Sequence, residues 1–373
     1  MKVLFIVFAL FYYIQSSDSM GKIINSEYTM VLDRISLGIS FESDKKITYC
    51  ESLDMQDTFC YNPGGAKNQN ILGYTTLNVN NVFLNCTKMK EPIYFLNGNL
   101  NLTFYYPVND SDKTIGLEKG ISLGFEKENE YNSLTKQLKK AGYIDKAIFS
   151  FIPVETIRGG LDFGEFKNDL VRGYYAMTCK VNQKIAKWGC DLSQISFKYS
   201  NNTTIIYSNT SYGYFQSSGP FLLVPKHFFD FLVETFFKDL LKKNQCEYVS
   251  TFFGYKSLVC ECDKFMQNFP IFGFVFDGYR ITFKSYSIFT QYGNSCYFVI
   301  EYKEGNDNFI FGSSFLLNFI SKFDNEENTV SFYSMNRFEK VSQNQIGKQI
   351  IFVSIIIQCI TCIIILLTSK NLK

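Results

Sequence analysis

Histidine and tryptophan are almost absent from this 373-residue chain, which has one of each, His227 and Trp188. A single histidine excludes a histidine-rich metal site and argues against nucleophilic catalysis by a Ser/His or Cys/His pair. The formal net charge of only +2 gives no basic surface for a polyanion, so no nucleic-acid partner is expected. No metal and no cofactor is predicted.

Acidic residues are missing from a long internal stretch. No Asp or Glu lies between Asp191 and Asp230, and this interval contains the run FQSSGPFLLVP from Phe215 to Pro225. This part of the chain therefore supplies no carboxylate to a reaction that needs one.

Both ends of the chain have features of membrane targeting. The apolar run from Val3 to Ile14, followed by small residues, predicts a signal peptide over residues 1–19. The apolar stretch from Ile350 to Leu367 covers about 27 Å as a helix, close to the thickness of a hydrocarbon core. We therefore expect a transmembrane helix over 346–369.

Charges near this second stretch predict its orientation. Lys370 and Lys373 follow it and only Lys348 precedes it, so the positive-inside rule predicts a cytosolic tail over 370–373. The chain is then a single-pass type I protein of the secretory pathway, in the plasma membrane or an endolysosomal or vacuolar membrane. A GPI anchor attached near Ser342 or Gly347 is the alternative.

Nine cysteines lie between the two terminal segments, in a compartment that permits disulfides. Their odd number leaves at least one without a partner. Six N-glycosylation sequons accompany them and predict a glycoprotein. They are at Asn85, Asn101, Asn109, Asn201, Asn202 and Asn209.

The body of the chain has the pattern of an all-β protein. Two β-rich runs flank Asp277-Gly278, which predicts a hairpin. Weaker hairpin signals lie at Asn97-Gly98 and Asn80-Asn81. Only two helices are expected, over 131–141 and 227–243, and His227 falls in the first turn of the second. Many short strands with two isolated helices favour antiparallel sheets over a βαβ arrangement.

Several motifs between residues 120 and 335 resemble pepsin-like aspartic proteases in order and spacing. The first, GISLGF from Gly120, precedes a predicted amphipathic helix and the run AIFSF from Ala147. GGLDFG from Gly159, NFP from Asn268 and FIFGSSFL from Phe309 follow, and the last resembles the closing motif of that family.

This resemblance implies a bilobal, mainly antiparallel all-β fold. We expect a shortened N-terminal lobe over 20–152 and a C-terminal lobe over 153–338, divided near Pro153. It also implies a polypeptide ligand or substrate between the lobes. In the family, a disulfide of the second lobe joins the counterpart of Cys296 to that of Cys262 or Cys260, which leaves Cys246 for the remaining one of these two.

The family's catalytic carboxylates have no clear counterpart here. No Asp-Thr-Gly occurs in the chain. Depending on the register, Ser217 or Gln216 occupies the place of the second-lobe aspartate. In the first lobe the candidate is Asp33, with Glu51 as its rival, and Tyr61 is the candidate for the flap tyrosine.

The resemblance and these departures together predict a family member that has lost its chemistry and acts in binding or surface structure. The alternative is an active aspartic endopeptidase, which hydrolyses peptide bonds with a carboxylate pair and an activated water. A third reading is a coat or granule protein that uses the fold only as a scaffold.

Overall fold

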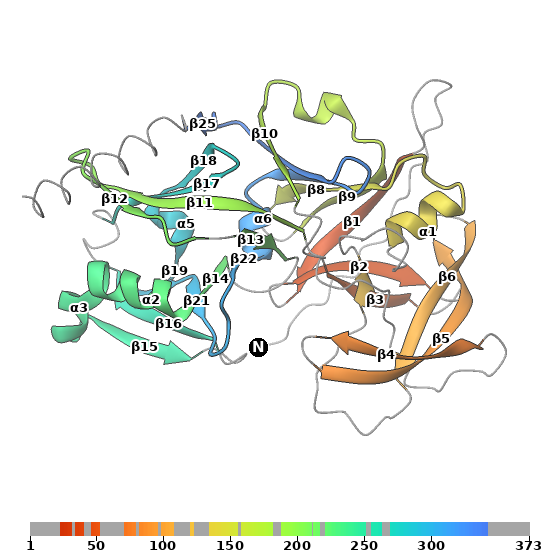
Figure 1. The fold of residues 1–373 in the computed structure, drawn as a ribbon, viewed down its shortest axis with the longest axis horizontal. Coiled ribbons are helices and arrows are strands. Elements are labelled where there is room, and N and C mark those ends of the chain that lie inside the picture. The colour runs from red at the N-terminus through yellow and green to blue at the C-terminus, as the bar shows by residue number, and fades with distance from the viewer. Residues whose placement is uncertain are drawn as a thin grey trace, which may run out of the picture.

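A computed structural model describes residues 23–31, 34–40, 46–52, 71–79, 82–95, 98–107, 120–122, 134–155, 158–181, 188–210, 212–216, 221–250, 255–262 and 269–341. Most of the body consists of β-strands, with a few short helices between them (Figure 1). The all-β class expected from the sequence is confirmed.

The first strands, up to the helix α1, are β1 (Ile23–Val31), β2 (Arg34–Ser40), β3 (Lys46–Ser52), β4 (Ile71–Val79), β5 (Val82–Phe95), β6 (Gly98–Pro107) and β7 (Gly120–Ser122). After α1 (Leu134–Lys140) come β8 (Ile148–Glu155), β9 (Arg158–Gly164), the 3-10 helix η1 (Asn168–Val171), β10 (Tyr175–Lys180), β11 (Gly189–Lys198), β12 (Thr204–Tyr207), β13 (Tyr212–Phe215) and β14 (Leu222–Val224).

The chain continues with α2 (Lys226–Leu232), the π-helical segment η2 (Val233–Phe237) and α3 (Lys238–Lys242). The remaining elements are β15 (Cys246–Ser250), β16 (Lys256–Glu261), β17 (Ile271–Phe276), β18 (Tyr279–Phe283), α5 (Ser285–Ile288), β19 (Phe289–Tyr292), β20 (Ser295–Phe298), β21 (Ile300–Tyr302), β22 (Phe309–Phe311), α6 (Ser313–Leu316), β23 (Ile320–Asp324), β24 (Thr329–Ser334) and β25 (Glu339–Lys340).

These strands form two large sheets. The first has the order β10-β24-β23-β8-β9-β1-β2-β3-β7, and β5 joins β4 and β6 to it through β2. The second has the order β19-β20-β16-β21-β14-β22-β13-β11-β17-β18-β25, with β12 on β11 and β15 on β16. The first sheet therefore combines strands from both ends of the body. Its two parts meet where β8 pairs antiparallel with β23.

The hairpin turns lie where the sequence predicts them. β17 and β18 pair around Asp277 and Gly278, whose φ angles are 45° and 79°. Two consecutive residues with positive φ are what a type I′ turn requires. β4 and β5 pair up to Val79 and Val82, and β5 pairs with β6 up to Phe95 and Gly98.

The helices partly match the expected ones. α1 ends before Gly142, whose φ of 74° is the left-handed conformation typical of the residue after a helix. The predicted helix over 227–243 is formed by α2, η2 and α3 in succession and begins one residue earlier, at Lys226. The one-turn helices α5 and α6 and the 3-10 turn η1 were not predicted, because so few residues carry no helical periodicity.

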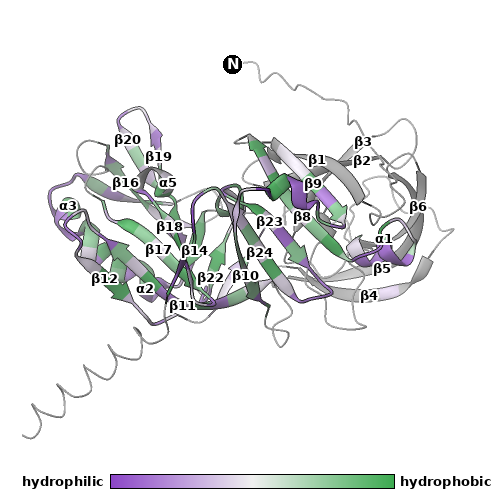
Figure 2. Cartoon of the chain, turned by 90° about the horizontal axis from the view of Figure 1, so that it is seen from above, coloured by the Kyte–Doolittle hydropathy of each residue, from purple (hydrophilic) through white to green (hydrophobic). Residues whose placement is uncertain are grey.

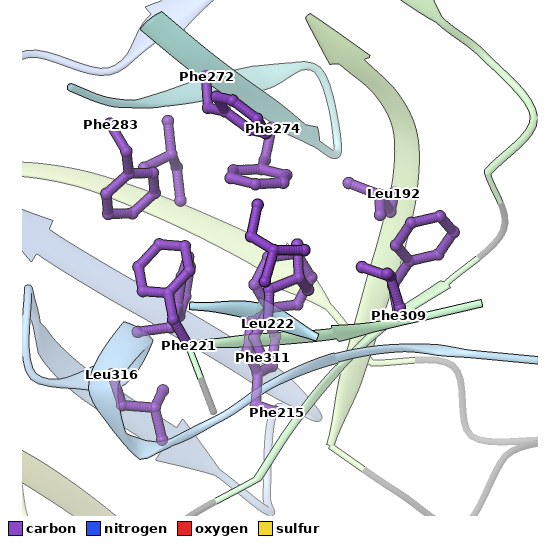
Figure 3. Packing of buried hydrophobic residues seen from close by; sticks show 14 of the residues in the cluster. Leu192, Phe215, Phe221, Leu222, Phe272, Phe274, Phe283, Phe309, Phe311 and Leu316 are labelled. Carbon is purple, nitrogen blue, oxygen red and sulfur yellow. The ribbon is translucent and has the colours of Figure 1, made fainter. Parts of the chain in front are cut away.

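Large side chains fill the space around the second sheet. Phe215, Phe221, Phe274, Phe311 and their neighbours pack in one cluster (Figure 3). Hydrophobic residues colour the strands of this sheet, including β17 and β22, whereas hydrophilic residues are prominent at α3 and in the connecting turns (Figure 2). A second group is built on Trp188, which is fully buried and contacts Phe149 and Phe323 with ring centroids 5.7 and 5.2 Å apart.

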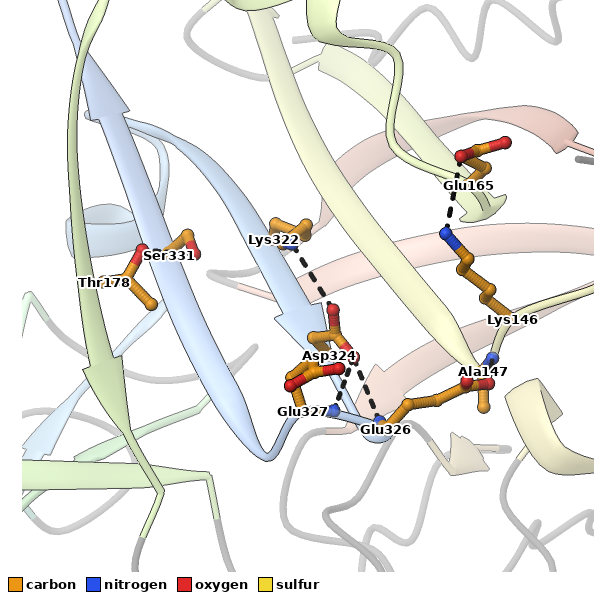
Figure 4. Close-up of polar contacts among 9 residues, drawn as sticks. All are labelled: Lys146, Ala147, Glu165, Thr178, Lys322, Asp324, Glu326, Glu327 and Ser331. Atoms are coloured by element: carbon orange, nitrogen blue, oxygen red, sulfur yellow. Dashed lines mark hydrogen bonds and ion pairs between the residues drawn. The ribbon is translucent and has the colours of Figure 1, made fainter. Parts of the chain in front are cut away.

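A row of polar residues crosses the first sheet where its two parts meet. Thr178, Ser331, Lys322, Ser150 and Asp162 are successive register partners on β10, β24, β23, β8 and β9. Directly paired residues point to the same face of a sheet. We call these five residues the polar row. Figure 4 shows Thr178 beside Ser331, with hydroxyl oxygens 2.9 Å apart, and Lys322 joined to the Asp324 carboxylate at 3.3 Å.

Several expected boundaries are not decided by the described residues. Residue 153, where we expect the lobes to divide, lies inside strand β8, and the division stays a prediction. The signal peptide over 1–19 and the segment over 346–369 lie outside the described residues. None of the helices within the described ranges is long and apolar enough to cross a membrane.

Candidate functional site

The run from Phe215 to Pro225 connects two strands that flank β22. β13 pairs parallel with β22, and β14 pairs antiparallel with its other edge, so that Phe311 is the register partner of both Phe215 and Leu222. The Gln216 N–H donates to the Phe311 carbonyl at 2.9 Å, and the Gly312 N–H donates to the Phe221 carbonyl at 3.2 Å. The strand β22 thus fixes both ends of the segment 217–220, which lies outside the described residues and which we call the second turn after its position in the family.

The entry to the second turn is tightly packed. Gly213 lies in β13, and a Cβ atom at this position would be 2.6 Å from Phe276 Cε1 and 2.8 Å from Phe311 Cε2. Only glycine leaves room for these two rings. On the other side, the Phe215 N–H donates to the Trp188 carbonyl at 2.8 Å. The aromatic core therefore determines where the second turn begins.

The side chains at the second turn bring no carboxylate. Ser217, the candidate for the family position, lies outside the described residues, and its rival Gln216 is half-buried directly after β13. Ser313, in the run that resembles the family's closing motif, is fully buried as the first residue of α6.

The first sheet contains a related pairing. β3 pairs parallel with β7, with Cys50, Glu51 and Ser52 opposite Gly120, Ile121 and Ser122. Both sheets therefore contain a strand that runs parallel to a short strand with a glycine shortly after it in the sequence, Gly312 directly after β22 and Gly124 two residues after β7. Glu51 lies inside β3 rather than after it, and the chain continues from β3 with Leu53 and Asp54.

The structure gives less information about the other first-lobe candidates, Asp33 and Tyr61. β1 and β2 pair antiparallel up to Val31 and Arg34, and Asp33 itself lies outside the described residues, as does Tyr61. Neither β1 nor β2 has a parallel partner among the described strands. The first carboxylate after β3 in the sequence is Asp54, which lies outside the described residues and which local similarity to the family motif does not single out. The Leu53-Asp54 dipeptide after a β-rich run was the available signal.

Two carboxyl groups lie together near the start of β11. Burial, and then the charge of Asp277, raises the pKa of Asp191 above its ordinary value. The Asp277 carboxylate accepts the backbone N–H of Lys180 at 2.8 Å. Asp191 pairs with Tyr212, four residues before Gln216, which is about 13 Å along a strand. Asp277 therefore binds a backbone amide, and both carboxyl groups are distant from the second turn.

Asp162 of the polar row has the largest pKa shift among the described carboxyl groups. Its side chain is only 8% exposed. Burial raises its pKa to about 6, and the charge of Lys167 opposes this in part. No three His, Cys, Asp or Glu side chains in the described part of the chain are grouped to hold a metal ion.

Three disulfides are formed among the described residues. Cys262 is bonded to Cys296 and Cys246 to Cys260, which are pairings that the family resemblance implied. The third, Cys179–Cys190, was not expected and connects β10 of the first sheet with β11 of the second.

Of the six sequons, Asn201, Asn202 and Asn209 are exposed around β12. Asn85 and Asn101 lie in β5 and β6, and Asn109 lies outside the described residues.

The comparisons with known proteins agree with this architecture. No curated protein matches the chain. The family model for eukaryotic aspartyl protease matches residues 109–335, more than half of the chain, including β13, the second turn and β22. The protein therefore belongs to the eukaryotic aspartyl protease family.

Proposed function

We propose that this protein is a membrane-anchored glycoprotein that binds polypeptide between its two lobes and does not hydrolyse it. The observation that carries this proposal is the second turn. Its supporting strands and both of its anchoring hydrogen bonds are present, yet no residue from 192 to 229 is acidic. An error in register therefore cannot restore a carboxylate at this turn.

The chemistry of the family explains why this loss matters. Two carboxylates within hydrogen-bond distance share one proton, because two adjacent negative charges cannot both form. One takes a proton from the attacking water, and the other polarises the carbonyl group that is cleaved. Gln216 or Ser217 donates a hydrogen bond but accepts no proton from water at neutral or acidic pH. Losing general acid-base catalysis costs on the order of 10²–10⁴ in rate.

The pairing of β3 with β7 supports a candidate for the remaining first-lobe carboxylate. In the second sheet Phe215 pairs with Phe311, the residue before Gly312. Extending the register of β3 and β7 by one residue matches Leu53 with Leu123, the residue before Gly124. Asp54 then takes the position that Gln216 has in the second lobe. One carboxylate without its partner remains suited to hydrogen bonding a bound peptide.

We expect the full chain, purified in detergent, to show no pepstatin-sensitive cleavage of denatured protein between about pH 3 and 6, the acid range in which a carboxylate pair shares one proton. Asp33→Asn, Glu51→Gln and Asp54→Asn should each leave this result unchanged. An active member of the family, assayed beside it, verifies the substrate and the inhibitor. Pepstatin-sensitive turnover that disappears in one of the three variants would establish the alternative function, an active endopeptidase.

Peptide binding separates the proposal from a purely structural role. We expect the full chain to select peptides from a displayed library. Gln216→Trp should abolish this binding, because the larger side chain fills the space beside the second turn. Gln291→Trp is the matched control, since Gln291 is exposed on β19 in the outer part of the second sheet. Equal binding by both variants, or no selection at all, would contradict a peptide site between the lobes.

The remaining parts of the proposal are membrane attachment and glycosylation. The exposure of Asn201, Asn202 and Asn209 supports glycosylation around β12, because an oligosaccharide needs a solvated attachment site. The Asn201 side chain accepts the Thr203 N–H at 3.0 Å, which fixes the local turn. Anchoring rests on the apolar segment near the C-terminus and its flanking lysines.

A further inference from the structure

Four cysteines are concentrated on three neighbouring strands of the second sheet. Cys246 of β15 is the register partner of Cys260 of β16, and Cys260 is in turn the register partner of Cys296 of β20. We call Cys246, Cys260 and Cys296 the cysteine row. Cys262 follows β16 directly, and its N–H donates to the Asn294 carbonyl at 2.9 Å.

The cysteine row places three sulfur atoms on one face of the sheet. Adjacent strands lie about 4.8 Å apart, and directly paired side chains point the same way. Cys260 is therefore flanked by its disulfide partner Cys246 on one side and by Cys296 on the other. Thiol–disulfide exchange proceeds by attack of a thiolate on one sulfur of a disulfide, opposite the sulfur that leaves. Cys296 lies on the side of Cys260 that this displacement requires.

Access from solvent differs among the four cysteines. Cys246, Cys260 and Cys296 are 6%, 4% and 0% exposed, whereas Cys262 is partly exposed at the edge of the core. A small thiol from solution therefore reaches the Cys262 sulfur first.

We propose that Cys262 is a site of mixed-disulfide formation with a low-molecular-weight thiol of the glutathione class, and that the cysteine row transfers the released thiolate to Cys246. In the first step the external thiolate bonds to Cys262, the Cys262–Cys296 bond breaks, and its electron pair stays on Cys296. In the second step Cys296 bonds to Cys260, the Cys246–Cys260 bond breaks, and its electron pair stays on Cys246, which takes a proton from water. Two disulfides are consumed and two are formed, so no oxidant is needed.

The transfer changes which strands are joined covalently. Before it, β15 is bonded to β16 through Cys246–Cys260. Cys262–Cys296 already joins the end of β16 to β20. After the transfer Cys260–Cys296 keeps these two strands joined, and β15 loses its covalent bond to β16. The second step is intramolecular between directly paired residues, which gives it a high effective concentration relative to any competing thiol in solution.

Limited reduction of the full chain tests the proposal. The protein is treated with less than one equivalent of glutathione, quenched with acid, alkylated and mapped by mass spectrometry. We expect glutathione on Cys262, a Cys260–Cys296 disulfide and the alkyl label on Cys246. A label on Cys296 with Cys246–Cys260 intact would overturn the transfer. Glutathione found on a cysteine other than Cys262 would overturn the assigned entry site.

Two controls make the result specific. Among the described residues, Cys179–Cys190 has no third cysteine in register, because Cys179 faces Val330 and Cys190 faces Gly213. Attack on this disulfide should therefore leave glutathione on one of its two cysteines and the alkyl label on the other. The double variant Cys246→Ser/Cys260→Ser removes the acceptor disulfide and should leave the label on Cys296. Should this variant fail to fold, the wild-type map alone decides between the two outcomes.

Discussion

Asp162→Asn is expected to stabilise the protein by about 3 kcal/mol at pH 7. Burial raises the pKa of this carboxyl from 3.8 to about 6, so ionising it costs more in the folded chain than in the unfolded chain. Each pKa unit corresponds to about 1.4 kcal/mol. Asparagine has nearly the same shape and does not ionise, so this cost disappears.

The pH dependence gives the sign of the effect. A carboxyl group with a raised folded pKa binds its proton more tightly in the native state. Its contribution to stability is therefore fully present below about pH 4 and is lost as the pH rises to about 6. Between these values the wild type should lose stability relative to Asp162→Asn, and above pH 6 the difference should stay constant.

Urea unfolding of both proteins at pH 4 and pH 7 measures this difference. Asp307→Asn is the matched control, because Asp307 is exposed between β21 and β22, and its stability should follow the wild type at both pH values. The same gain for Asp162→Asn at pH 4 and pH 7 would show that ionisation of Asp162 is not its cause.

Gly213→Ala is expected to destabilise the protein by about 3 kcal/mol. The added methyl group would be 2.6 Å from the ring of Phe276 and 2.8 Å from that of Phe311. Both rings are fully buried, so neither moves without disturbing the core. Overpacking of this kind typically costs about 1–3 kcal/mol.

A double-mutant cycle identifies the cause. Phe276→Leu removes part of the ring that the new methyl group meets, so the double variant should be more stable than the sum of the single effects by about 1 kcal/mol. Gly305→Ala provides a control of a different kind. Its Cβ meets no atom within 4 Å, but its φ is +79°, and it should cost only the left-handed strain of about 1–2 kcal/mol. Additive effects of Gly213→Ala and Phe276→Leu would exclude the steric explanation.

Local chemistry made part of the fold predictable. Asp277-Gly278 demands positive φ at two successive positions, and this requirement is visible in the sequence alone. The helix over 227–243 was equally predictable, because its apolar residues recur with helical spacing. The parallel pairing of β3 with β7 and of β13 with β22 was not, because the partners are remote in the chain and their short strands carry little periodicity.

The candidate site was likewise predictable only where local sequence decides it. The missing carboxylate of the second lobe follows from composition, since an interval without acidic residues remains so in any register. The first-lobe position depends on which strand leads into the turn. Asp33 was favoured from local similarity, whereas the pairing of β3 directs attention to Asp54. The disulfide Cys179–Cys190 was missed because only the meeting of β10 and β11 brings its two cysteines together.

The junction of β8 with β23 has a consequence for how the protein is made. Ser150 pairs with Lys322, so β8 leaves the ribosome long before its neighbour is synthesised. Until then, one edge of β8 has unpaired backbone groups and the Phe149 ring lacks its stacking partner Phe323. Such an edge invites association with other chains. The nascent chain therefore keeps an edge open to association until the arrival of β23 closes the sheet.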